Sequence, residues 1–218
     1  MTGFYGDAHR QLQDEFDSRA MADVLETVIV TPQINGEAKA FIESRAFFFL
    51  STVDASGHPT VSHKGGAGGF VRVIDPSTIV FPSYDGNGMF LSMGNIAHDG
   101  RIGLLFMDFE RPHRLRAQAT AVVSRDDPMM SEYPGADLVV RATVTSVFVN
   151  CPRYISPQKP VGESKYVPDA SGRAPLPGWK KIDALQPFLP ARFQGMADAE
   201  GDLITADEYT RRLLHGDA

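Results

Sequence analysis

The sequence predicts an α+β fold that is mainly β, an antiparallel β-barrel with helices before and after it. Three observations lead to this prediction. The hydrophobic pattern changes from helical spacing to strand-like alternation near residue 46. Turn sequences separate many short strand-like segments, and the two longest segments alternate cleanly between faces. Short strands joined by turns favour a closed barrel, because closure removes exposed sheet edges.

Length and composition are those of an ordinary globular protein. The chain has 218 residues, of which 43% are hydrophobic and 22% are charged, enough for one large domain or a core with helical additions. The formal net charge of -6 argues against general affinity for nucleic acid or an anionic membrane. Cys151 is the only cysteine, which excludes an intrachain disulfide and a cysteine-based zinc cluster and fits a reducing cytoplasm.

The sequence shows no secretion signal and no membrane-spanning run, so we expect a cytoplasmic protein. The N-terminus carries Asp7, Asp14, Glu15 and Asp17 and has no apolar core of signal-peptide length. The longest strongly apolar run, residues 46–50, is far shorter than the roughly 20 residues that a bilayer requires.

We expect residues 1–45 to form a helical extension. Apolar residues recur there at a spacing of four, namely Phe16, Ala20, Val24 and Val28. Asn35 can cap a further helix, which carries Ala38, Phe41 and Ile42 on one side.

We expect residues 46–155 to form the β core. The predicted strands are Ala46–Val53, Pro59–Lys64, Phe70–Ile74, Thr78–Phe81, Ile102–Met107, Arg114–Ser124 and Leu138–Asn150. Residues 54–57 have a turn sequence, Asp-Ala-Ser-Gly. In the strand 114–124, Leu115, Ala117, Ala119, Ala121 and Val123 share one face, and Arg116, Gln118, Thr120 and Ser124 lie on the other.

One helix interrupts the strands and another ends the chain. Asn87 stands where an N-cap would, and Met89, Met93 and Ile96 follow at helical spacing. Residues 156–190 are rich in Pro, Gly, Lys and Asp without periodicity, which predicts an extended surface segment able to cross to a partner subunit. Thr205 opens a capping-box sequence and Gly216 is the expected helix stop. We expect residues 156–218 to belong to the same single domain as the core.

Common catalytic and metal-binding motifs are absent from the sequence. There is no Gly-x-Ser-x-Gly elbow, no Gly-x-x-x-x-Gly-Lys-Ser/Thr loop and no His-Glu-x-x-His. The six histidines lie apart without short metal-ligand spacing, so we expect no metal site. No acid or base stands out as catalytic.

Residues 60–70 are the first candidate binding segment. Ser62 and Lys64 alternate along a strand that runs directly into a glycine-rich loop. Glycines let a backbone approach a flat ligand closely and expose N–H donors. The alternative interpretation is a flexible hairpin loop in which Lys64 is a solvated charge at the strand end.

Residues 81–96 are the second candidate segment. A strand ends at Phe81-Pro82, a Gly/Asn loop follows, and a helix begins. The free N–H groups and the dipole of a helix start make a natural phosphate site, and Ser92 and Asn95 add uncharged donors. The alternative is that Asn87 only caps a packing helix and that the glycines only form a turn.

Together the two segments resemble the pyridoxamine 5′-phosphate oxidase-like superfamily of FMN-binding split-barrel proteins. The resemblance lies in the order of a hydrophobic strand, a turn, Val-Ser-x-Lys-Gly at 61–65, Gly-Phe-Val-Arg-Val at 69–73, and a strand leading into a Gly-Asn loop. Asn95-Ile96, Arg-Ile-Gly-Leu-Leu-Phe, Leu115-Arg116 and Asn-Cys-Pro-Arg-Tyr-Ile at 150–155 follow in the same order. The resemblance covers about Phe41 to Ile155.

The resemblance implies a six-stranded antiparallel split β-barrel and a homodimer with two FMN sites between its subunits. It places Val61, Ser62, His63 and Lys64 along the flavin, with Lys64 near the phosphate or the polar edge of the ring. Phe81 and Pro82 would border the ring, and Asn87, Gly88, Met89, Ser92 and Asn95 would lie near the phosphate. The remaining candidates are Arg116 and Arg153, from either subunit.

The chain departs from the family pattern in the phosphate-facing helix. Members commonly carry Arg or Lys there, whereas this chain has Met89, Leu91 and Ser92. Phosphate binding would rest on backbone N–H groups, Ser92, Asn95 and Lys64. The C-terminal Arg and Trp features of true pyridoxamine 5′-phosphate oxidases are not recognisable either, so vitamin B6 synthesis is not predicted.

The predicted function is that of an FMN-dependent oxidoreductase acting on an unidentified small molecule, with the flavin carrying out the electron chemistry. Two alternatives stay open. The deazaflavin F420, which related proteins use with a similar barrel, could replace FMN, or the protein could store or carry flavin or haem without turnover. The expected partners are a second copy of the chain and the substrate, with neither nucleic acid nor a membrane.

Overall fold

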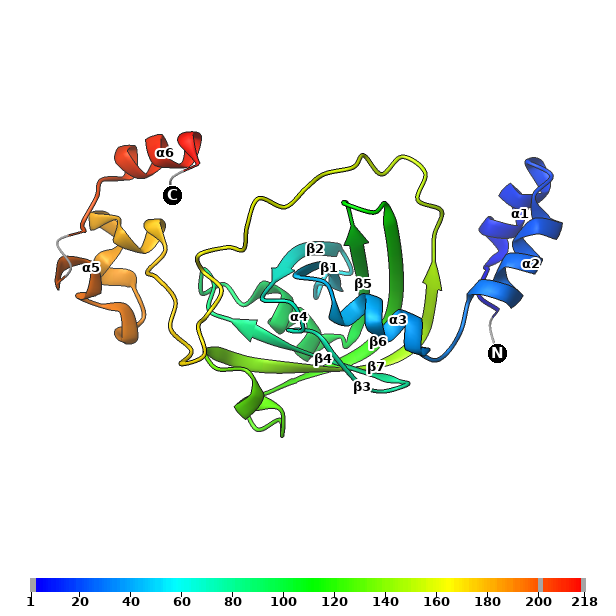
Figure 1. Ribbon diagram of the computed structural model, residues 1–218, viewed down its shortest axis with the longest axis horizontal. Coiled ribbons are helices and arrows are strands. Elements are labelled where there is room, and N and C mark those ends of the chain that lie inside the picture. Colours follow the sequence, from blue (N-terminus) through cyan, green and yellow to red (C-terminus); the bar gives the residue numbers. More distant parts are fainter. Residues whose placement is uncertain (1–2, 200–201, 217–218) are drawn as a thin grey trace. The chain divides into compact units, whose positions relative to one another are not determined.

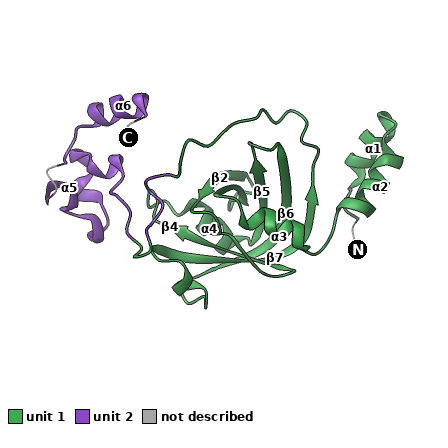
Figure 2. Cartoon of the chain, viewed as in Figure 1, with its two compact units in different colours: residues 1–163, 170–172 green, residues 164–169, 173–218 purple. Residues whose placement is uncertain are grey.

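The computed structural model describes residues 3–199 and 202–216. Its contacts divide the chain into two compact units, residues 1–163 with 170–172 and residues 164–169 with 173–218 (Figure 2). All strands of the sheet belong to the first unit. The expected boundaries after residues 45 and 155, and the expectation of one domain, stay predictions.

The predicted N-terminal helices are present as three elements, α1 (Asp7–Glu15), α2 (Arg19–Ile29) and α3 (Gly36–Glu43). The predicted cap of α3 is confirmed, because the Asn35 side chain accepts a hydrogen bond of 2.8 Å from the Ala38 N–H. Helix α3 buries Ile42 in the core of the first unit. Helices α1 and α2 contain no buried residue.

Seven strands form one antiparallel sheet in the order β2-β1-β5-β6-β7-β4-β3 (Figure 1). They are β1 (Phe47–Val53), β2 (Pro59–Gly65), β3 (Arg72–Asp75), β4 (Thr78–Tyr84), β5 (Arg101–Asp108), β6 (His113–Ser124) and β7 (Ala136–Val149). Each strand segment predicted from the pattern is therefore present. The turn at 54–57 is confirmed as well, with Gly57 at a φ of 84°.

The predicted closed barrel and the implied count of six strands are not observed. The sheet is open, and β2 and β3 are its edges. β3 has only four residues, and helix α4 (Leu91–His98) covers part of β2 through side-chain hydrogen bonds. Barrel closure is favoured because unpaired backbone groups at a sheet edge can pair with other chains. Here the shortness of β3 and the packing of α4 on β2 limit the number of such groups.

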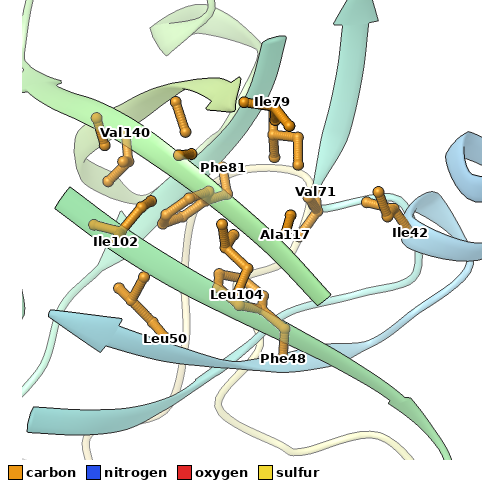
Figure 3. Close-up of a cluster of buried hydrophobic side chains, with 14 of the residues drawn as sticks. Ile42, Phe48, Leu50, Val71, Ile79, Phe81, Ile102, Leu104, Ala117 and Val140 are labelled. Atoms are coloured by element: carbon orange, nitrogen blue, oxygen red, sulfur yellow. The ribbon is translucent and has the colours of Figure 1, made fainter. Parts of the chain in front are cut away.

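Alternation along the strands directs one set of side chains into a single core. β1 follows the alternation, with Phe48, Leu50 and Thr52 buried between partly exposed neighbours. In β6 the predicted apolar face is confirmed, with Val123 partly buried and the rest buried. Figure 3 shows Phe48, Phe81, Leu104 and Val140 converging from four strands, and the Phe48 and Phe81 rings lie 4.9 Å apart.

The helix after β4 begins later than predicted, and Asn87 is not its cap. Helix α4 starts at Leu91, and its N-cap residue Phe90 has left-handed backbone angles of φ 49° and ψ 27°. Asn87 lies in the preceding loop, where its side chain accepts a hydrogen bond of 3.1 Å from the Met89 N–H. An Asn can satisfy a loop backbone as readily as a helix start, and the sequence does not distinguish the two.

The second unit consists of helical turns and short helices. They are η2 (Gly178–Lys181), η3 (Asp183–Phe188), η4 (Ala191–Phe193), α5 (Met196–Ala199) and α6 (Ala206–His215). The prediction of an extended segment over 156–190 is therefore wrong for its last part, where Ile182 and Leu189 are buried without a periodic pattern. The cap of α6 by Thr205 is confirmed, and so is the stop at Gly216, which has a φ of 77°. No helix in the described parts of either unit is long and apolar enough to cross a membrane.

Candidate functional site

The two candidate segments of the sequence meet where β2 lies against α4. Along β2, Thr60, Ser62 and Lys64 are half-buried, and the residues between them are exposed. Ser62 Oγ lies 2.9 Å from Ser92 Oγ, in the first turn of α4. This hydrogen bond places the start of α4 beside the strand that carries Lys64.

Asn95 fixes the same helix to the sheet from one turn further along. Its Nδ2 donates hydrogen bonds to Thr52 Oγ1 at 2.9 Å and to Thr60 Oγ1 at 3.2 Å, and the two threonine hydroxyls lie 2.7 Å apart. Asn95 and Ser92 are both buried. The Asn95 donor group is thus used inside the protein, which differs from its predicted place beside a phosphate.

Lys64 is a half-buried cation. It is the cross-strand neighbour of the core residue Phe48 and lies on the same side of β2 as Ser62, about 7 Å further along the strand. Within the described residues no acceptor or carboxylate pairs with its ammonium group. Burial lowers the pKa of the Lys64 ammonium. A partly desolvated cation without a partner favours the arrival of an anion.

The N-terminus of α4 supplies neutral donors beside the strand that carries this cation. No side chain caps the helix, so the backbone N–H groups of its first turn have no side-chain acceptor. Met89, Phe90 and Leu91 are 68%, 50% and 52% exposed, which leaves this helix start open to solvent. Uncapped N–H groups and the helix dipole favour negative charge at this point. Lys64 and the start of α4 together form the candidate anion site.

The remaining predicted residues on β2 and β4 fall into two groups. Val61, which is 70% exposed, and His63 lie on the opposite side of β2, where the His63 ring stacks 5.3 Å from that of Phe47. Phe81 and Pro82 are both buried in β4, and the Phe81 side chain belongs to the core. Their place beside a ring stays a prediction.

The predicted loop residues and arginines are exposed. Asn87, Gly88 and Met89 form the loop before α4, with Gly88 at a φ of 78°. Arg116 lies on β6, separated from β2 by two strands, and Arg153 lies in the turn after β7. No contact in the described residues joins either arginine to Lys64, so one chain does not bring them into the site.

Arg116 belongs to the side of the sheet that faces away from the core. Cross-strand partners share a face, and the pairing connects His63, Phe49, Leu105, Arg116 and Phe148 in one row. We call this side of β2, β1, β5, β6 and the end of β7 the outer sheet face. Its apolar members Phe47, Phe49, Leu105 and Phe148 are only half-buried.

Sequence reasoning missed two groups at one end of the outer sheet face. Arg114 Nε and Asn150 Oδ1 are buried atoms without a hydrogen-bond partner. They belong to neighbouring chain segments, because the Asn150 N–H donates to the Arg114 carbonyl at 3.4 Å. Within the described residues, both atoms are exceptions to the rule that buried polar atoms are paired. Strand alternation places Arg114 on the face of Arg116, but burial could not be read from the sequence.

A hollow of about 300 Å³ lies elsewhere in the first unit. Its walls come from α2, α3, the segment between them, the start of β6 and the end of β7, and its ionisable residues are Glu37 and His113. None of its lining residues belongs to β2 or α4. It is therefore separate from the candidate anion site.

Comparison with known proteins identifies the family to which the site belongs. The family model described as pyridoxamine 5′-phosphate oxidase matches residues 34–151, which include both candidate segments. A search of the curated proteins found no match.

Similar solved structures include a single-residue variant of HupZ from Group A Streptococcus, with 23% identity over 54% of this chain and 99% of that chain and a TM-score of 0.45. A candidate pyridoxamine 5′-phosphate oxidase from Lactobacillus delbrueckii has 27% identity over 54% of this chain and 95% of its own, with a TM-score of 0.43. An F420 reductase has 16% identity over 50% of this chain and 94% of its own, with a TM-score of 0.40.

Proposed function

The chain belongs to the pyridoxamine 5′-phosphate oxidase family, and we propose that it is an oxidoreductase that binds FMN where β2 meets α4. The observation that carries this proposal is the 2.9 Å contact between Ser62 and Ser92, because it sets the uncapped start of α4 beside the strand of Lys64. FMN combines an anionic phosphate with a flat ring. The half-buried cation and the free N–H groups can bind the phosphate. The strand that ends in a glycine-rich loop can lie against the flat ring.

The residues of this chain bind and orient the cofactor in this proposal. Lys64 and the first-turn N–H groups of α4 hold the phosphate, and partial burial strengthens that attraction over its value in water. The backbone of 61–64 lies along the ring, and Asn95 keeps α4 in register with β1 and β2. Bound FMN would supply the electron transfer to or from a small-molecule substrate.

A second copy of the chain completes the site in our proposal. The aromatic side chains of the outer sheet face are only half-buried in the single chain. A homodimer that buries this face brings Arg116 or Arg153 of the second subunit toward the flavin. We place the protein in the cytoplasm, where its exposed Cys151 stays reduced.

The test is a comparison of FMN with riboflavin, titrated by fluorescence quenching into flavin-free protein. The proposal predicts that FMN binds more tightly, because riboflavin lacks the phosphate. The preference should weaken only modestly between low and physiological salt, because one cation and several neutral donors hold the anion. Equal affinity for the two flavins would show that this site does not bind the phosphate.

F420 in place of FMN, and flavin or haem carriage without turnover, are the alternative functions. No feature of the site favours either over FMN. Oxidised FMN gives a pair of flavin bands, F420 a single blue-violet band and haem a Soret band. Bleaching of a bound flavin by NADH or NADPH would support an enzyme over a carrier.

A further inference from the structure

The hairpin of α1 and α2 turns polar side chains inward and apolar side chains outward. Arg10 lies between the two helices, with Nη1 donating to Asp23 at 2.6 Å and to Gln13 at 2.8 Å, and its guanidinium sits 4.8 Å from the Tyr5 ring. A further ion pair joins Arg19 to Asp14. The hairpin is thus held by charge pairs, which is the reverse of the usual arrangement of an amphipathic hairpin.

Large apolar side chains form an exposed stripe on the other side of this hairpin. On α2 they recur at the spacing of one helical face, α1 adds one, and the residue directly after α1 adds another; the hairpin stripe consists of Leu12, Phe16, Met21, Val24, Leu25 and Val28. Their exposed fractions run from 41% to 72%. Exposed apolar patches on a protein surface mark sites of interaction with other proteins.

Charge decides which kind of partner can cover the hairpin stripe. Residues 1–30 contain six carboxylates and two arginines, a net charge of -4. This charge disfavours an anionic membrane and nucleic acid. It complements a surface that is both apolar and basic. The outer sheet face has this character, since it carries half-buried aromatic rings together with His63, Arg114 and Arg116. Within the described residues neither arginine forms an ion pair.

The hairpin is anchored at the border of that face. The Phe4 ring packs edge-on against Phe148 of β7 with centroids 5.4 Å apart. After α2, Thr31 exchanges backbone hydrogen bonds of 2.9 and 2.7 Å with Val147. A two-fold contact through the outer sheet face would therefore bring each hairpin next to the second copy.

We propose that the hairpin stripe packs on the outer sheet face of a second copy of this chain, so that residues 3–30 act as an exchanged arm of the dimer. This inference rests on the homodimer proposed above. It adds that the arm, and not only the sheet, supplies the contact area between the copies.

The first test maps where position 24 lies in the intact protein. Val24 is replaced by a photo-crosslinking amino acid, and isotope-labelled and unlabelled copies are mixed before irradiation. The arm predicts cross-links between copies, from position 24 to residues of β1, β5 or β6. The same probe at Thr27, exposed on another side of α2, should give few of them. Cross-links confined to one copy, or joining two positions 24, would overturn the arm.

The second test measures dimer affinity by light scattering over a dilution series. Both side chains of Met21→Glu/Val24→Glu are exposed in the single chain, so the variant should fold, as circular dichroism can verify. The arm predicts a dimer dissociation constant raised at least tenfold, while Thr27→Glu leaves it unchanged. An unchanged constant in the double variant would overturn the arm and leave the sheet-mediated dimer standing. A wild-type monomer would overturn both, and flavin absorbance would still report the flavin site separately.

Discussion

Lys64 is the residue on which the proposed phosphate site depends most. Replacing it with Ala should weaken FMN binding by about 1–3 kcal/mol, the range for a lost charge-assisted hydrogen bond, and leave riboflavin binding nearly unchanged. Lys64→Arg should restore part of the affinity, because the charge returns in a different shape. Arg125→Ala, which removes an exposed cation after β6, is the matched control. If FMN affinity were unchanged in Lys64→Ala, Lys64 would not contact the phosphate and would be a solvated charge at a strand end.

The same lysine should give FMN binding an alkaline limit. Burial lowers the pKa of Lys64 in the flavin-free protein, and a bound phosphate would raise it again. FMN affinity should therefore be level near neutral pH and fall as the pH rises through the lowered pKa of the free protein. In Lys64→Ala, FMN affinity should not decrease in this pH range, and the affinity of the wild-type protein for riboflavin should not decrease there either.

Asn95 should contribute to stability more than to phosphate recognition. Its buried amide bridges α4 to two threonines, so Asn95→Ala would remove the hydrogen bonds that Thr52 and Thr60 accept from it. We expect the free energy of unfolding to fall by about 1–3 kcal/mol, measured by urea denaturation. Asn87→Ala, in the exposed loop, should cost much less. If Asn95→Ala lost FMN affinity while its free energy of unfolding stayed unchanged, Asn95 would be a phosphate-binding residue and not mainly a stabilising one.

At the scale of elements, the connection between β6 and β7 depends on one ion pair. Arg141 donates two hydrogen bonds of 2.8 Å to the carboxylate of Asp127, which also accepts from the Met129 N–H. The hydrogen bonds from Arg141 hold the pKa of Asp127 below its usual value. A depressed carboxyl pKa stabilises the fold above the unfolded pKa of about 3.9, and this contribution is lost as the pH falls through the folded value.

Asp127→Asn should accordingly lower the free energy of unfolding by about 1–3 kcal/mol at neutral pH. The difference from wild type should start to shrink below about pH 4, where the carboxyl of the unfolded chain becomes protonated, and should disappear once the pH falls below the lower pKa of the folded carboxyl. Urea denaturation at neutral pH and at a pH below about 4 measures this difference in the free energy of unfolding. Asp126→Asn, at the exposed neighbouring residue, is the control. A difference that stays constant with pH would show that the ion pair is not its source.

The elements also show which parts of the fold were visible in the sequence. The alternation of apolar and polar residues predicted β1 and β6, because one face of each strand is buried in the core. This pattern can be read from neighbouring residues alone. Closure of the sheet was not predictable, because it depends on which edges pair across the chain. The start of α4 was misplaced since Asn87 serves a loop as well as it would a helix. The burial of Arg114 Nε and Asn150 Oδ1 depends on packing that no local pattern reports.

We expect the whole molecule to be a stable homodimer. The half-exposed outer sheet face and the hairpin stripe both expose apolar surface that a second copy can bury. Light scattering at micromolar concentration should give twice the mass of one chain. A monomer that retains its flavin would contradict a site shared between subunits.

The absorbance spectrum of the freshly purified protein tests the central claim most directly. Lys64 and the uncapped α4 are proposed to retain FMN through its phosphate, so the protein should be yellow, with the two absorption bands of oxidised flavin. Denaturation should release a flavin that chromatography identifies as FMN. A single blue-violet band or a Soret band would instead identify F420 or haem, and flavin-free protein that takes up no added FMN would contradict the proposed site.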